Sequence, residues 1–391
     1  MRMKTEIKNG WEIKNFEDCL EKVIYTNKIQ RKDFLISGEY PIISQEQDFV
    51  NGFWTNSDDL FKVKKPIVIF GDHTQVLKYV DFDFVLGADG VKILQPKNDI
   101  EPRFFYYFLQ SINLGSLGYA RHYRLLKEIV VTYPKSLPEQ QRIVSILDEA
   151  FAAIAAAKTN AEQNLKNAKV LFESYLQGVF SDKIKGLKSE SLDELCELIV
   201  DCEHKTAPIQ ETGYPSIRTP NIGKGVLILD GVNRVSEKTY NEWTRRAIPQ
   251  AGDLILAREA PAGNIAVIPE NIKVCLGQRT VLIRPKKNRI YSKFLAYLIL
   301  SKDVQEQLLS HSTGATVEHV NMKDIRAFKI YNLSTLSEQE IIVQKLDPLS
   351  AETKRLEAIY QQKILDLEEL KKSVLQKAFK GELRLFNIPI Q

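Results

Sequence analysis

The sequence predicts an α+β fold: two strand-rich α/β domains separated by two long helices that form an antiparallel coiled coil, with an internal pseudo-two-fold repeat. Three observations predict it. The stretch LPEQQRIVSILDEA at 137–150 returns 199 residues later as LSEQEIIVQKLDPL. Short β-branched runs bounded by Gly and Pro precede each copy. After each opening, apolar residues recur at alternating steps of three and four. A chain of 391 residues also suits two domains or more.

The repeat keeps its register over two long segments. Residues 137–180 and 336–379 align without a gap, and the identities include Glu139 with Glu338 and Gln140 with Gln339. Leu147 and Asp148 likewise match Leu346 and Asp347. Agreement sustained over about 44 residues indicates a tandem duplication.

Each copy reads as one long helix of roughly 60 Å. We expect the two helices to pair antiparallel, because a duplicated chain folds most simply around a pseudo-two-fold axis. Two amphipathic helices, each lying on its own domain, are the alternative. Pro348 should kink or restart the second helix. The expected coiled-coil seam comprises Ile143, Leu147, Ile154, Leu165, Phe172, Tyr175, Ile342, Leu346, Leu356, Tyr360, Ile364, Leu367 and Val374.

The strand-rich segments repeat more faintly. GEYPIIS (38–44) resembles TGYPSIR (212–218), and GADGVKIL from Gly87 resembles GQRTVLIR from Gly277. In both halves a short helix and a strand then lead to the long helix, and the runs 66–70, 253–257 and 280–284 have the composition of buried strands. The predicted domains are 1–136 and 186–335, with helical spacers at 137–185 and 336–383 and a tail at 384–391.

Composition narrows the class of protein. With 44% apolar and 27% charged residues, the chain is an ordinary globular one. The formal net charge of +4 permits contact with nucleic acid but does not drive tight binding. The amino-terminal residues lack an apolar signal core, and no apolar run approaches the roughly 18 residues of a membrane span. We therefore expect a soluble, cytoplasmic protein that does not contact membranes.

The repeated EQxxIVxxLD-like opening of a long helix, each time after a strand-rich domain, resembles the specificity subunit of type I restriction-modification systems. The resemblance extends from GWEIKNFEDC (10–19) to LQKAFKGEL (375–383). In the second domain, VDCEHKTAP, YPSIRTPNI, GDLILAREAPAGNIAV and CLGQRTVLIRP look like segments of that family's target recognition domains.

The resemblance implies a division of labour. Each domain is expected to recognise one half of a split, asymmetric target in double-stranded DNA. The long helices are expected to set the distance between the two recognition domains. Half-sites on one face of DNA lie about 10 bp apart from centre to centre. The family's partners are two DNA adenine methyltransferase subunits and restriction-translocation subunits. S-adenosylmethionine and ATP are expected on those partners, with no cofactor on this chain.

Comparing the two halves separates shared framework from candidate DNA contacts. Gly87 and Gly277 are shared, whereas Ala88-Asp89 faces Gln278-Arg279 in a gapless alignment. Arginine, glutamine, asparagine and histidine side chains can bond base edges or phosphates, but they can equally brace loops or form a solvated surface. The candidates are Ser44, Gln45, Gln47, His73, Arg121, His122, Tyr123 and Arg124 in the first half, and His204, Arg218, Thr219, Asn221, Arg258, Gln278, Arg279, Thr313, Thr316, His319 and Asn321 in the second.

No catalytic site emerges from motif spacing. The sequence lacks an Asn/Asp-Pro-Pro-aromatic motif and a GxxxxGK[ST] loop. Cys196, Cys202 and His204 form a loosely metal-like C-x5-C-x-H, but a pair of buried thiols plus a loop histidine is the simpler interpretation, and no metal site is expected. We therefore expect a non-catalytic recognition subunit. A coiled-coil adaptor without a DNA role and a stand-alone DNA-modifying enzyme remain the alternatives.

Overall fold

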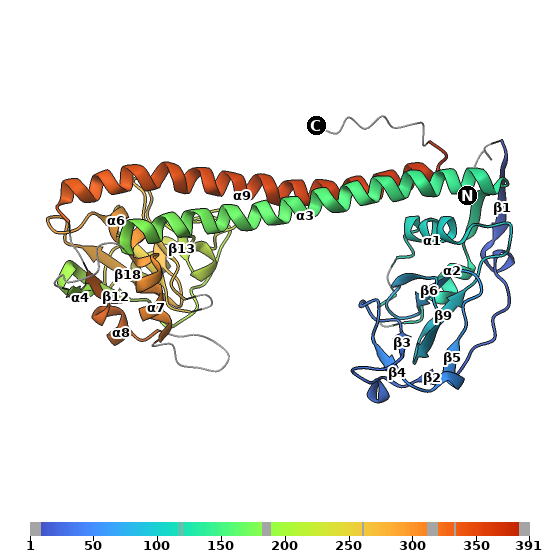
Figure 1. The fold of residues 1–391 in the computed structure, drawn as a ribbon. Helices are drawn as coiled ribbons and strands as arrows, with labels where there is room; N and C mark the ends of the chain where they lie inside the picture. Colours follow the sequence, from blue (N-terminus) through green and yellow to red (C-terminus); the bar gives the residue numbers. More distant parts are fainter. Residues whose placement is uncertain are drawn as a thin grey trace. The chain divides into compact units, whose positions relative to one another are not determined.

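The computed structural model describes residues 9–115, 117–118, 120–181, 189–259, 262–310, 320–331 and 334–382. They form two compact units. The first contains the described residues up to Glu162 together with those from Gln362 onward, and the second contains those from Gln163 to Gln361. The long helices α3 (Leu137–Ser181) and α9 (Leu336–Phe379) each contribute to both units (Figure 1).

The first unit holds three small sheets. Their orders are β2-β8-β3-β4 with β5 on β8, β7-β6-β9, and β1-β10. Helix α1 (Pro102–Ser111) and the short α2 (Tyr123–Lys127) follow the central strands. The strands are β1 (Trp11–Asn15), β2 (Lys28–Ile29), β3 (Tyr40–Ile43), β4 (Gly52–Trp54), β5 (Leu60–Phe61), β6 (Ile67–Gly71), β7 (Leu77–Val80), β8 (Phe84–Gly87), β9 (Val91–Leu94) and β10 (Val130–Pro134).

The second unit has sheets β12-β18-β15-β16, β14-β13-β17 and β11-β19. Its strands are β11 (Ser189–Ser191), β12 (Cys196–Asp201), β13 (Tyr214–Ile217), β14 (Arg234–Val235), β15 (Leu254–Ala257), β16 (Ile265–Val267), β17 (Cys275–Leu276), β18 (Thr280–Pro285) and β19 (Lys329–Tyr331). Its helices are α4 (Leu192–Leu195), α5 (Glu237–Trp243), α6 (Ser292–Ile299), α7 (Lys302–Ser310) and α8 (Met322–Ala327).

The two units share a connectivity. In each, a Tyr-Pro strand pairs in parallel with a later strand: β3 with β8 in the first unit and β13 with β17 in the second. A central antiparallel strand lies between two neighbours (β6 between β7 and β9, β15 between β16 and β18), and the first strand pairs with the last. The repeated segments of the sequence therefore form repeated elements.

The predicted residue pairing of the loops after Gly87 and Gly277 is wrong by one position. The amide of Asp72, just after β6, donates to the carbonyl of Gly90 at 2.7 Å, and the amide of Arg258, just after β15, donates to that of Arg279 at 2.9 Å. Arg279 is thus equivalent to Gly90 rather than to Asp89, and the loop is one residue longer in the first unit. Both residues have positive φ, 78° and 68°, which glycine adopts without strain and arginine adopts rarely.

In each unit, segments of both long helices pack on the hydrophobic core. In the first unit, Lys158 on α3 bonds Glu368 on α9 at 2.7 Å, and Lys371 lies over the Phe151 ring. The residue numbers rise along α3 as they fall along α9, so these segments run antiparallel. In the second unit, Phe172 and Leu176 share a core with residues from the start of α9.

Most of the expected seam is shielded from solvent. Tyr175 is the exception, because it is 43% exposed while Leu176 is buried. Near Tyr175, α3 packs on the hydrophobic core of the second unit, and Phe172 contacts the ring of Tyr297 there. The helix face that carries Phe172 and Leu176 therefore points into this core, and Leu176 is buried in place of Tyr175. Helix α9 continues through Pro348, so the expected restart does not occur. Ile143, Leu147, Ile154, Phe172, Leu346 and Ile364 are buried, and Leu165, Ile342, Leu356, Tyr360, Leu367 and Val374 are half-buried.

None of the helices in the described part of the chain is both long and apolar enough to cross a membrane.

Candidate nucleic-acid interface

In the first unit, three loops that follow β3, β6 and β8 meet, and we call residues 44–47, 72–75 and 88–90 the first loop cluster. The side-chain carbonyl of Gln45 accepts the amide of His73 at 3.1 Å, and the hydroxyl of Thr74 donates to the Gln45 carbonyl at 2.5 Å. The Asp72–Gly90 bond ties in the third loop. The fold thus brings Gln45 and His73 together, with Gln47 exposed beside them.

The RHYR segment at 121–124 divides into two pairs. His122 is buried: its Nε2 accepts the amide of Leu117 at 3.2 Å, so its Nδ1 carries the proton that points at the Asp72 carbonyl 3.1 Å away. Tyr123 packs edge-on against Phe16, and its amide donates to the Asp72 carboxylate. His122 is therefore a buried brace of the first loop cluster, and Tyr123 is half-buried with its backbone bonded to the same loop. Arg121 and Arg124 are exposed.

Ser44 is another brace. It is 2% exposed, and its hydroxyl and amide both bond the side-chain oxygen of Asn51 at 2.9 and 2.8 Å. A Cβ on Gly87 would lie 2.7 Å from the Ser44 Cβ, and the equivalent Gly277 would clash with Arg218 in the same way. These shared glycines allow the loops to approach each other closely, which explains why both halves retain them.

Sequence reasoning missed Lys78, which is 3% exposed inside the first unit. Its ammonium donates to the carbonyls of Asp48 and Phe49 and to the side chain of Asn51. Burial lowers the pKa of Lys78 to about 8. The lysine shapes the loop that carries Gln45 and Gln47. An isolated lysine within the strand-like stretch LKYV is the only signal of it in the sequence.

In the second unit, His204, Arg258, Glu259, Gln278 and Arg279 line a polar pocket of about 200 Å³, which we call the second loop cluster. The side-chain amide of Gln278 reaches the His204 carbonyl at 3.5 Å, and Arg279 pairs with Glu259 at 2.9 Å. Residues predicted from three separate segments are therefore neighbours here.

Arg258 is buried within this cluster, at 6% exposure. Its guanidinium bonds the Asp201 carboxylate at 2.5 Å and the Val320 carbonyl at 3.0 Å. It holds three segments together, so the prediction that it contacts DNA is not supported by its position. His204 contacts the same carboxylate at 3.2 Å, but its side chain is 69% exposed.

The remaining candidates divide in the same way. Arg218 is exposed, whereas Thr219 is buried and Asn221 closes the short turn by accepting the Arg218 amide at 3.1 Å. Asn221 and Thr219 are thus parts of the turn. Asn321 is exposed at the start of α8. Thr313, Thr316 and His319 lie outside the described residues.

The four cysteines are buried free thiols. Burial raises the pKa of Cys196 to about 12 and that of Cys275 to about 11, which disfavours the thiolate that a metal needs. Within the ranges that the structure describes, no group of three or more His, Cys, Asp or Glu side chains is arranged to hold a metal ion.

Each unit therefore carries polar loops on a rigid strand framework, a common location for binding residues. The candidate side chains that stay accessible differ between the units. The exposed ones are Gln47, Arg121 and Arg124 in the first unit and His204, Arg218, Arg279 and Asn321 in the second, and Gln45 and Gln278 are half-buried. Glutamine and arginine are the side chains that pair bidentately with adenine and guanine edges. The same strand framework, carrying different polar side chains in its two copies, is suited to binding two different polar surfaces.

Comparisons with known proteins agree with this arrangement. A family model described as "Type I restriction modification DNA specificity domain" matches the chain twice, over residues 8–167 and 185–366. The chain is 24% identical over 338 residues to the EcoR124I/EcoR124II specificity subunit of Escherichia coli, covering 82% of this chain and 81% of the relative. It is 23% identical over 364 residues to the EcoBI specificity subunit of the same organism, covering 85% and 75%.

Solved structures show the same fold. A chain from a structure that describes complex assembly and conformational transition of the type I R-M system matches with a TM-score of 0.69 and 17% identity, covering 97% of this chain and 100% of that one. The HsdS subunit from Thermoanaerobacter tengcongensis matches with a TM-score of 0.52 and 17% identity, covering 97% and 99%. Because the family model accounts for most of the sequence, this chain belongs to the family of type I restriction-modification DNA specificity subunits.

Proposed function

We propose that this chain directs its restriction-modification complex to an asymmetric, bipartite target in double-stranded DNA. One observation carries the proposal: the same strand framework occurs twice and presents different exposed side chains in its two loop clusters. Two related but different readers recognise two different half-sites. The proposed base and phosphate contacts are the candidates that remain accessible: the exposed Gln47, Arg121, Arg124, His204, Arg218, Arg279 and Asn321, and the half-buried Gln45 and Gln278.

The long helices form the spacer between the readers. We propose that α3 and α9 pair antiparallel along their length as a coiled coil, supported by their antiparallel contacts in the first unit. The proposed boundaries are recognition domains at 1–136 and 186–335, spacers at 137–185 and 336–383, and a tail at 384–391. Half-sites on one face of the duplex then lie about 10 bp apart from centre to centre.

The chemistry belongs to partner subunits. We propose that the chain assembles with two DNA adenine methyltransferase subunits, and with restriction-translocation subunits in the complete complex. The names of its relatives, specificity subunits of type I restriction enzymes, support this. S-adenosylmethionine and ATP bind those partners, and the complex works in the cytoplasm. The low net charge of +4 is consistent with a chain that needs the other subunits for tight DNA binding.

A genome-wide map of methylated adenine tests this proposal, recorded with and without the gene. The expected result is loss of one asymmetric motif with two half-sites at fixed spacing. Replacing Gln278 and Arg279 with alanine should relax one half-site and leave the other intact, whereas Lys238→Ala, an exposed change on α5, serves as the control. An unchanged map on deletion in a strain whose methyltransferase is active would refute the proposal.

A further inference from the structure

A buried glutamine sits at the start of each long helix. Gln140 and Gln339 are both 0% exposed, although each carries a polar amide. A buried amide costs free energy unless its hydrogen bonds are made, and a leucine would fill a similar volume without that requirement. The pair occupies equivalent places in the duplicated chain, so both copies retain a polar group where an apolar one would suffice for packing.

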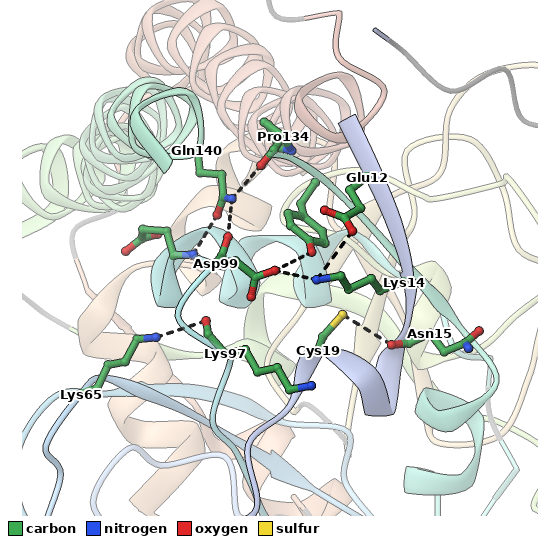
Figure 2. A network of polar contacts seen from close by, with 11 residues as sticks. Glu12, Lys14, Asn15, Cys19, Lys65, Lys97, Asp99, Pro134 and Gln140 are labelled. Carbon is green, nitrogen blue, oxygen red and sulfur yellow. Dashed lines mark hydrogen bonds and ion pairs between the residues drawn. The ribbon is translucent and has the colours of Figure 1, made fainter. Parts of the chain in front are cut away.

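Both glutamines make the same set of bonds. The Gln140 carbonyl accepts the amide of Glu101 at 2.8 Å, and its NH₂ donates to the carbonyls of Asp99 and Pro134 at 2.9 and 2.7 Å. Figure 2 shows this side chain reaching from α3 to the loop before α1 and to the end of β10.

In the second unit, the Gln339 carbonyl accepts the amide of Tyr291 at 2.8 Å, and its NH₂ donates to the carbonyls of Arg289 and Ser334 at 3.3 and 2.8 Å. Glu101 and Tyr291 are the N-cap residues of α1 and α6, so the bonds to the loop and cap before these helices are equivalent. The third acceptor differs slightly, because Pro134 ends β10 while Ser334 lies three residues beyond β19.

The loop that receives the glutamine is itself held to the first strand of its unit. Lys14 pairs with Asp99 at 2.6 Å (Figure 2). Tyr133 donates to the same carboxylate at 2.9 Å. In the second unit the ion pair is kept with the charges exchanged, since Arg289 binds Glu190 at 2.8 Å. The residue types changed while the connection persisted, which indicates that the connection itself matters.

A second attachment lies two turns further along each helix. Asp148 accepts the hydroxyl of Tyr107 and pairs with Arg103 at 3.0 Å, both on α1. Asp347 accepts the hydroxyl of Tyr297 at 2.7 Å and pairs with Lys293 at 2.6 Å, both on α6. A single attachment leaves a domain able to tilt on its helix. Two attachments about 12 Å apart along the axis determine the tilt as well as the position.

We propose that Gln140 and Gln339, together with Asp148 and Asp347, are positioning residues that set the angle of each recognition domain on its helix and thereby the number of base pairs between the half-sites. The inference rests on the proposed function. Adjacent base pairs differ by about 3.4 Å along the duplex and about 35° around it. A domain held at one angle can therefore accept one spacing and reject its neighbours.

The test maps methylated adenine in the strain carrying the complete system with Gln140→Leu. The half-site bases should be unchanged, while the share of methylated sites with a spacing one base pair longer or shorter rises about tenfold, equivalent to about 1.4 kcal/mol of lost discrimination. Tyr107→Phe removes only a hydroxyl from the second attachment and should broaden the spacing in the same direction. Arg142→Ala, exposed on the same turn of α3, is the matched control.

Each outcome decides the matter. Unchanged spacing in Tyr107→Phe, and in Gln140→Leu where that variant assembles, would overturn the inference. Altered bases within the first half-site would also overturn it, because the attachments would then be supporting the reading loops and not the angle. If Gln140→Leu does not assemble, Tyr107→Phe alone carries the decision. Absence of any bipartite motif in the wild-type map would instead refute the proposed function.

Discussion

Replacing Arg258 with alanine should destabilise the second recognition domain strongly. Its guanidinium joins the ends of β12 and β15 to Val320, two residues before α8, through the Asp201 carboxylate and the Val320 carbonyl. The alanine variant leaves the Asp201 carboxylate in a partly buried position, beside the exposed His204 side chain 3.2 Å away. The change thus removes a structural brace and not a surface charge.

The magnitude follows from burial. The side chains of Arg258 and Asp201 are 7% and 18% exposed at a separation of 2.5 Å. Removing one partner of a buried ion pair lowers the free energy of unfolding by about 3–5 kcal/mol. Because Asp201 keeps some exposure to solvent, we expect a loss at the lower end, about 3 kcal/mol. Arg279→Ala is the matched control. That arginine pairs with Glu259 but is 55% exposed, and such pairs contribute about 0–1 kcal/mol.

Urea unfolding of the full chain measures the difference. Trp243 lies in the second unit, so Trp11→Phe and Trp54→Phe make its fluorescence a reporter of that unit. Arg258→Ala should lower the free energy of unfolding by about 3 kcal/mol and Arg279→Ala by under about 1. A loss below about 1 kcal/mol in Arg258→Ala, or equal losses in both variants, would refute the argument that Arg258 is a brace.

Three further predictions follow from the same structure. Leu147→Ala and Leu346→Ala, at fully buried helix positions, should each lower the free energy of unfolding in denaturant by about 2–5 kcal/mol. Leu171→Ala, at an exposed position of α3, should change it by under about 0.5 kcal/mol. Equal effects in the three variants would contradict the packing of α3 and α9 on the cores. Arg121→Ala should weaken binding of the assembled complex to all DNA sequences alike. It should also reduce the magnitude of the slope of log affinity against log salt concentration by about 0.9. An unchanged slope in salt titrations would exclude a phosphate contact by Arg121. For Lys78, burial lowers the folded-state pKa to about 8 from 10.5, so between these values the unfolded chain binds more protons and this lysine adds stability as pH rises. Lys78→Met should lack that rise in denaturant unfolding between pH 8 and 10, and a parallel pH profile would contradict it.

Much of the architecture was open to sequence reasoning because it depends on periodicity and repetition. The matching openings at Leu137 and Leu336 begin the two long helices, and the Tyr-Pro strands and shared glycines occupy equivalent places. The roles of individual polar side chains were harder to predict. His122 and Arg258 read as DNA contacts because of their chemistry, yet both are buried braces. The only signal of Lys78 was its isolation within the strand-like stretch LKYV, and a single lysine in a strand is easily taken for a surface residue.

The sequence by itself determined the duplication, the helix lengths and the family. These follow from local patterns and from matches within one chain. Only the tertiary structure decided which polar residues are exposed and which are bonded inward, because that depends on partners far away in sequence: Asp72 for His122, and Asp201 for Arg258. It also revealed what the repeated Gln140 and Gln339 do. Each makes three hydrogen bonds to loops and strand ends of its own unit, and no spacing in the sequence specifies those partners.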